Sequence, residues 1–490
     1  MNVLHRVLLA PWIASPRSSR WLVVMTFVVA LAGAVVTRIS THGARPWLLS
    51  VMVLGAGNAL CWLLLMPNCL FLAIAARHLR MPGITRDVSW SMPLYAVLVI
   101  GVPMVLQLPQ GNVMAFAVVQ LLVAARAMLY MLLPAYAGIL LCLLPALHAI
   151  ARHLVALPGI ADPRFVSWCG GLVVLLLLLL AWRWHQLLHG EIPTSGLRAP
   201  GLINLRRNMG RAQSDPLTDA TLLRRRPAWL IARVDLSDVG LRAPVQSLRV
   251  ALGGGYLPQT AAGRLIQLAV ALLAMLAVGL LLFAVTMGDN SGGQFLHYLL
   301  SREGFTYEAW VFGAFSVGAS AVAVEFLLLR WERVNAELPL LALLPGLSGN
   351  EDIKRLLLRT AIQRPAGYIV GLLLMGWLWV AGYGYGWVIG WAMLVVSLAS
   401  LGYLYTMVLG IFAGRPLSAL GKALLIVALF TLSSLTLLLP PLWHDWSALS
   451  EANMQTALGF SWLLLTLFLC WLGRRGWQGL QQRPHPFIPN

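Results

Sequence analysis

Charged residues are scarce in this sequence: they make up 11% of its 490 residues, and only 17 residues are acidic. Soluble globular domains carry about 25% charged residues. Hydrophobic residues account for 59% of the chain, and its mean hydropathy is +0.79. This balance excludes an ordinary soluble domain and predicts an integral membrane protein.

A phosphate-binding loop of the G-x-x-x-x-G-K-[S/T] type is also missing. The nearest phrase, GRPLSALGK at 414–422, has the wrong spacing and precedes an apolar stretch instead of following a strand. We therefore expect no cofactor on this chain and no enzyme activity of its own. Any hydrolysis of ATP with Mg²⁺ is expected on a separate partner.

Cysteine and histidine groupings of the metal-binding kind are absent as well. The cysteines lie inside or beside apolar runs without a C-x-x-C pair, which favours packing residues over disulfides or metal ligands. They are Cys61, Cys69, Cys142, Cys169 and Cys470. His185 and His189 share one helical face near Glu191, but no third ligand follows by spacing, so we favour interfacial residues over a metal site.

Long apolar runs are abundant. A helix needs about 20 apolar residues to cross a hydrocarbon core about 30 Å thick, and runs that are apolar on every side predict helices rather than barrel strands. Bounded by charge, proline and glycine, the predicted spans lie near 21–37, 48–74, 93–108, 112–128, 129–150, 164–184, 265–287, 308–329, 366–383, 386–412, 418–439 and 456–473. The predicted fold is an all-α polytopic membrane protein, with about 12 transmembrane helices in two six-helix halves.

A basic stretch separates the two groups of spans. Residues 185–264 contain eleven arginines against five acidic residues, which places them in the cytoplasm by the positive-inside rule. We predict a first transmembrane half over 1–184, a cytoplasmic linker over 185–264 and a second transmembrane half over 265–490, with both termini cytoplasmic. The net charge of +18 fits contact with anionic membrane lipids better than binding of nucleic acid.

Residues 112–150 leave two alternatives open, because they are continuously apolar except for Arg126. They form either two spans or one long broken helix, and the second choice changes the parity of the first half. We favour two spans because they keep the basic linker in the cytoplasm.

A short phrase recurs in both halves. Met-Pro-Gly-Ile-Thr at 81–85 and Leu-Pro-Gly-Leu-Ser at 344–348 follow the second span of each half, which favours a distant repeat. A third related phrase, at 151–162, falls on the opposite side of the membrane in this topology, so the phrase is alternatively only a common way to end a helix.

The second copy introduces an unusually charged stretch. Ser348 and Glu351 form an S-x-x-E capping box, which predicts a helix start near 349. Ile353, Leu357 and their neighbours line one face, and Pro365 is expected to end the helix before the next span. The pattern indicates a short amphipathic helix at the cytoplasmic membrane surface.

This helix has two interpretations. It is either a lipid anchor or a docking element for another protein. Five of the seventeen acidic residues fall within 325–352, where a helix facing anionic lipid gains from bases and loses from acids. A mixed-sign patch favours a protein partner.

Two six-span units, each with an amphipathic cytoplasmic helix between its second and third spans, resemble the permease subunit of a type-2 ABC exporter. The stretch ELPLLALLPGL at 337–347, followed by a charged helix, is similar to the corresponding loop of bacterial permeases of this family. The resemblance implies ATP-driven export, with a separate, dimeric ATPase docked on these coupling helices in a bacterial-type inner membrane. Many family members carry six spans and dimerise, whereas this chain carries both halves.

The resemblance also implies which residues contact the ATPase. In the second half they are Glu337, Pro345, Gly346, Glu351, Asp352 and Arg355, and in the first half Arg80, Pro82, Gly83 and Asp87.

Two charges fall inside predicted spans. Arg126 and Glu325 are candidates for a charged pathway, or alternatively reach toward the membrane surface. Glu325 is the main carboxylate that an ion-coupled secondary transporter, the second functional hypothesis, would use. A membrane-embedded enzyme acting on a lipid-linked substrate is a third hypothesis, but acids and histidines do not cluster as that chemistry needs.

Overall fold

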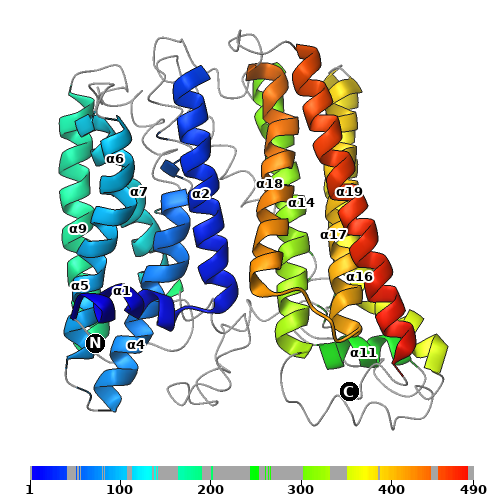
Figure 1. Ribbon diagram of the computed structural model, residues 1–490, viewed down its shortest axis with the longest axis horizontal. Coiled ribbons are helices and arrows are strands. Elements are labelled where there is room, and N and C mark those ends of the chain that lie inside the picture. Colours follow the sequence, from blue (N-terminus) through cyan, green and yellow to red (C-terminus); the bar gives the residue numbers. More distant parts are fainter. Residues whose placement is uncertain are drawn as a thin grey trace. The chain divides into compact units, whose positions relative to one another are not determined.

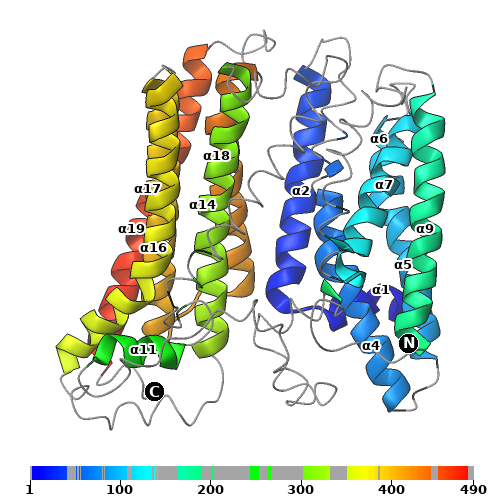
Figure 2. The same ribbon diagram turned by 180° about the vertical axis from the view of Figure 1, so that it is seen from behind.

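The computed structural model describes residues 3–40, 51–107, 113–141, 164–189, 200–201, 243–265, 302–331, 350–383, 387–442 and 451–483, with short gaps inside the second, third and sixth ranges. Every regular element in these residues is a helix (Figures 1 and 2). Eight of the helices are long and apolar enough to cross a membrane. The expected all-α, multi-pass architecture is thus confirmed for the described residues, and the total of about twelve spans stays a prediction.

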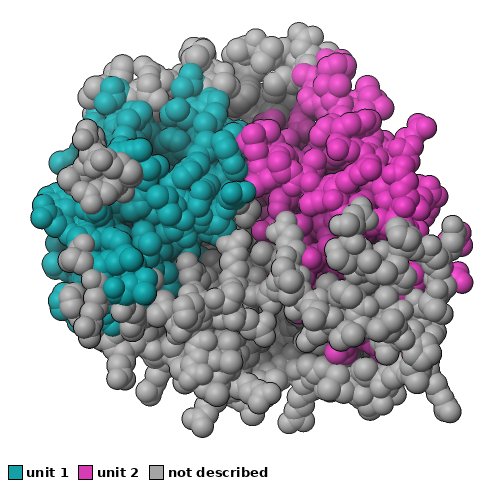
Figure 3. Space-filling model, turned by 60° about the horizontal axis from the view of Figure 1, so that its bottom comes forward, with its two compact units in different colours: residues 1–207, 211–227, 283–292 teal, residues 208–210, 228–282, 293–490 magenta. Residues whose placement is uncertain are grey.

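The chain divides into two compact units (Figure 3). The described helices of the first unit lie between residues 3 and 201, and those of the second lie between 243 and 483. The boundaries that the sequence predicts at 184 and 264 stay predictions.

The first unit packs its helices around a core that includes the fully buried Met66, Met128 and Leu132. Its elements are α1 (Val3–Ala14), α2 (Arg17–Ser40), η1 (Cys61–Leu65), α4 (Met66–His78), α5 (Ile84–Ala96), η2 (Val97–Gly101), α6 (Val102–Gln107), α7 (Val113–Leu132) and α9 (Phe165–His189). α5, η2 and α6 form one candidate span. The π-helical turn η2 begins four residues after Pro93, which lacks a backbone N–H for the regular pattern.

α1 lies across the first unit instead of continuing into α2. The two helices meet at a bend of 115°. Arg20 satisfies the end of α1 by donating from Nε to the carbonyl of Ser15 at 2.7 Å and from Nη2 to the carbonyl of Ile13 at 3.0 Å. The Tyr95 hydroxyl donates to the carbonyl of Leu8 at 2.9 Å, which fixes α1 across α5 (Figure 1).

α7 and α9 pack side by side and run in the same direction. Arg183, near the end of α9, donates from Nε to the carbonyl of Leu132, the last residue of α7, at 3.1 Å. α7 therefore ends four residues beyond the predicted boundary at 128, and Arg126 lies inside it. Whether 112–150 form two spans stays a prediction, because residues 142–163 lie outside the described residues.

The second unit has a larger described core, around buried residues that include Leu357, Tyr403 and Phe412. Its elements are α11 (Pro244–Leu252), α14 (Arg302–Trp331), α16 (Asn350–Tyr383), α17 (Trp387–Phe412), α18 (Ala419–Leu442) and α19 (Glu451–Gln482). α14 packs on α16, α17 and α18, and α17 packs on α19. A Cβ added at Gly476 of α19 would lie 2.9 Å from the Cβ of Leu409, so this glycine lets the two helices approach closely.

α16 is longer than the sequence predicts. The expected end before Pro365 is wrong, because one helix continues through this proline from Asn350 to Tyr383. Figure 2 shows its first turns slanting at the lower end of the unit before the helix turns upright. Proline removes one helical hydrogen bond and favours a kink. Ala361 and Ile369, on either side of it, are fully buried, so packing holds the helix together across the kink.

Candidate functional site

Basic side chains gather at one end of the second unit, where α14, α17 and α19 end and α16 and α18 begin. Contacts show that these helix ends meet: Lys354 Nζ lies 3.3 Å from the carbonyl of Gln481, and the rings of Trp331 and Phe412 are 4.7 Å apart. The basic residues of this end are Arg330, Lys354, Arg355, Arg359, Arg364, Arg415, Lys422, Arg474, Arg475 and Arg483. Such one-sided charge is typical of a cytoplasmic membrane face.

The start of α16 is amphipathic, as the sequence predicts. Ile353, Leu357 and Ala361 are buried, whereas Arg355 and Arg359 are exposed on the other side. The observed start at Asn350 agrees with the predicted start near 349. Lys354 differs from the expectation of an outward-facing base, because its side chain is 9% exposed and donates to the end of α19.

The predicted docking residues of the second half divide into two groups. Asp352 and Arg355 are exposed on the first turns of α16, where a partner has access to them. Glu351 lies in the first turn of the same helix. Glu337, Pro345 and Gly346 lie outside the described residues.

In the first unit, the predicted docking residues surround the turn between α4 and α5. Gly83 takes a φ of 97°, which L side chains rarely adopt, and α5 begins at the next residue. Asp87 lies in the first turn of α5, where a carboxylate suits the helix dipole. Arg80 and Pro82 lie outside the described residues. The candidate span therefore begins with α5, and the described residues between α4 and α5 form no separate amphipathic helix.

This hairpin turn carries exposed apolar side chains. Leu79 is 67% exposed, Met81 50% and Trp90 62%. Arg77 and Arg86 are exposed beside them. Apolar side chains gathered on a basic, solvent-accessible tip are typical of an interaction surface.

The α4–α5 hairpin extends beyond α1. Tyr95, which contacts α1, lies eleven residues after the start of α5, so the tip projects about 16 Å past α1 at 1.5 Å per residue. α11 crosses α16 in the same way, because Arg249 Nη2 donates to Gln363 Oε1 at 3.0 Å and Leu248 is buried. Gln363 lies thirteen residues after the start of α16.

Comparison with protein-family models, curated proteins and solved structures finds no match for this chain. The proposed function therefore rests on the sequence and structure of this chain alone.

The two intramembrane charges lie in different units. Glu325 of α14 forms an ion pair with Lys422 of α18, at 3.5 Å between Oε2 and Nζ. Both lie near the basic ends of their candidate spans. Arg126 is half-buried on α7 of the first unit. The structure thus gives Glu325 a partner on a neighbouring helix.

Sequence reasoning missed several residues of this end. Lys422 had a usable signal, since it is one of only two lysines and begins an apolar stretch. α11 lies inside the stretch 185–264 that the sequence predicts to be a linker. Leu248 and Leu252 have helical spacing, which was the available signal for this helix. Arg183 and Arg483 had no local signal, because each contacts a helix end far away in the sequence.

Proposed function

We propose that this chain is the membrane-spanning permease subunit of an ATP-driven ABC exporter. A separate ATPase docks on the projecting tip between α4 and α5 and on the first turns of α16. ATP binding and hydrolysis in the partner then drive outward movement of a substrate by moving these helices. The observation that carries the proposal is the exposed apolar turn formed by Leu79 and Met81, outside the candidate spans.

The position of the tip favours a protein over lipid. Leu79 and Met81 lie between the candidate spans Gly57–Ile74 and Ile84–Val105, at the end of the hairpin that extends past α1. Side chains outside the spans are accessible to water, where exposed apolar groups are unfavourable unless a partner covers them. The exposed Asp352 and Arg355 give the start of α16 the mixed charge that suits a protein surface.

Matching features in the two units support a duplicated permease. Each unit has a short helix that packs on a longer one, α1 on α5 and α11 on α16. Pro93 and Pro365 lie inside those longer helices. Duplication would let one chain offer both docking positions that an ATPase dimer needs.

The orientation follows from charge. The basic ends of the helices face the cytoplasm of a bacterial-type inner membrane, with both termini on that side, because positive side chains are retained where anionic lipids and the membrane potential favour them.

An ion-coupled transporter is the alternative, and Glu325 is the carboxylate it would use. Pairing with Lys422 favours a structural ion pair, since a coupling carboxylate has to release and rebind its ion. Transport that follows a proton gradient and ignores ATP would support this alternative instead.

A pull-down of the tagged, full-length chain from native membranes in mild detergent tests the proposal. We expect an ATP-hydrolysing partner with a phosphate-binding loop to co-purify. Asp352→Arg reverses the charge on α16 and is expected to reduce the recovered ATPase several-fold, whereas Asp352→Glu is expected to retain it. Recovery of the tagged chain without ATPase activity would contradict the proposal.

A further inference from the structure

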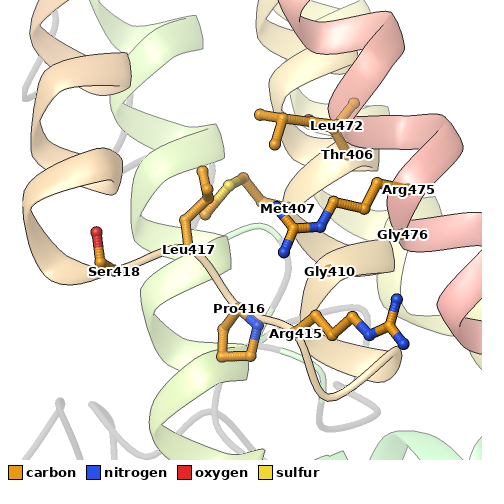
Figure 4. A pocket seen from close by; sticks show the side chains of 10 residues that line it. All are labelled: Thr406, Met407, Gly410, Arg415, Pro416, Leu417, Ser418, Leu472, Arg475 and Gly476. Atoms are coloured by element: carbon orange, nitrogen blue, oxygen red, sulfur yellow. The ribbon is translucent and has the colours of Figure 1, made fainter.

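A cavity of about 330 Å³ opens at the basic end of the second unit, between the last turns of α17, the loop that leads to α18, and α19. Arg415 from the loop and Arg475 from α19 both line it. Figure 4 shows Arg475 reaching from α19 across the cavity toward the loop, and Arg415 lying below it. Sites for small ligands start at about this volume.

The loop that carries Arg415 has a fixed shape. Gly414 takes a φ of 68° and donates to the carbonyl of Ile411 at 3.0 Å, and the Arg415 N–H donates to the carbonyl of Gly410 at 3.0 Å, which together form a Schellman end to α17. Ser418 then caps α18, since its Oγ accepts the Gly421 N–H at 3.1 Å. Arg415 is therefore held at the cavity by the backbone on both sides.

The two arginines lack carboxylate partners among the described residues. Arg415 Nη2 donates a long hydrogen bond of 3.4 Å to Gln482 Oε1, and the Arg475 guanidinium lies 5.7 Å from the ring centroid of Trp471. Neither contact neutralises a positive charge. Two guanidinium groups at one cavity match the charge of a phosphate group and are its usual hydrogen-bond donors.

The rest of the cavity is apolar. Met407, Leu417 and Leu472 line it, and Met407 and Leu472 are buried. On α19, the exposed side chains Leu464, Phe468 and Trp471 follow Arg475 toward the opposite end at helical spacing, so they form an apolar stripe that leads away from the cavity. Acyl chains can pack against such a stripe, whereas inorganic phosphate has no apolar surface to bury there.

We propose that this cavity binds the phosphate of an anionic phospholipid, with the acyl chains along the stripe of α19. Basic pockets between membrane helices bind lipid head groups in this way. The site holds α17, α18 and α19 together at the membrane surface. It is independent of the ATPase proposal, because it needs only the membrane.

Native mass spectrometry of the full-length protein in mild detergent tests this site, with phosphatidylglycerol and phosphatidylcholine added as probes. We expect the wild-type protein to retain phosphatidylglycerol in preference to phosphatidylcholine. Arg415→Gln with Arg475→Gln is expected to weaken phosphatidylglycerol binding roughly tenfold or more, because each base near an anionic head group contributes about one kcal/mol. Arg474→Gln is the matched control, since the exposed Arg474 is not part of the cavity lining, and it is expected to change binding less than twofold.

Two further experiments distinguish a loss of binding from a folding defect, and a bound lipid from free phosphate. Arg475→Lys keeps the charge and is expected to retain most of the binding, and Arg475→Gln alone is expected to lose several-fold with normal membrane insertion. Equal phosphatidylglycerol binding by wild type, single and double variants would overturn the proposal. Displacement of the lipid by millimolar inorganic phosphate would overturn the assignment to a lipid and indicate a site for free phosphate.

Discussion

Arg483 donates a hydrogen bond from Nη1 to the carbonyl of Phe412, the last residue of α17, at 3.2 Å. Arg183 makes the corresponding contact in the first unit, where its Nε reaches the carbonyl of Leu132 at the end of α7. In each unit an arginine near the end of the last described helix thus satisfies the end of a parallel neighbour. This shared device supports the proposed duplication.

Arg483→Met should lower the stability of the second unit. Burial lowers the pKa of the Arg483 guanidinium, but arginine starts from so high a value that it stays charged at neutral pH, so the lost bond is a charge-assisted one. We expect a loss of about 1–2 kcal/mol in the free energy of unfolding, measured as a fall in melting temperature in detergent. Arg474→Met is the control, and an equal fall in both variants would contradict a specific role for the Arg483 contact.

Gly414→Ala should be more harmful than Gly83→Ala. Both positions have positive φ, at 68° and 97°, and backbone strain from alanine costs about 1 kcal/mol or more at each. Only at Gly414 would the new Cβ also run into the Arg483 guanidinium, whereas Gly83 has nothing within 4 Å. The melting temperature of Gly414→Ala should therefore be lower than that of Gly83→Ala in thermal unfolding.

Gly371→Ala provides the matched control for both, because Gly371 lies inside α16 with open space around it. This change should be neutral or stabilising by about 0.5–1 kcal/mol. If Gly371→Ala were as destabilising as Gly414→Ala, the conformational argument would be wrong.

The ion pair between Glu325 and Lys422 should show coupling in a double-mutant cycle. Glu325→Gln or Lys422→Met alone leaves one charge partly buried and should cost up to about 3 kcal/mol. The two changes together should cost less than the sum of the single losses, by about 0.5–3 kcal/mol. Additive losses in the melting temperature would indicate that the pair contributes nothing as a pair.

Local patterns predicted the fold class and the parts of the site that depend on neighbouring residues. The start of α16 at Asn350 and its apolar face follow from capping and helical spacing. The continuation through Pro365 did not follow, because packing of Ala361 and Ile369 overrides the local preference of proline. The pairing of Lys422 with Glu325 and the projection of the hairpin past α1 depend on contacts between distant segments, which no local pattern contains.

The most direct test of the account compares Leu79→Glu with Leu79→Met in the full-length chain. Leu79 is exposed in the turn between α4 and α5, outside both candidate spans, so glutamate should keep the fold but remove an apolar contact with the partner, whereas methionine should retain it. We measure ATPase activity that co-purifies with equal amounts of membrane-inserted chain. The account predicts activity with wild type and Leu79→Met and a loss of roughly tenfold or more with Leu79→Glu. Equal activity with all three chains, or none with wild type, would contradict it.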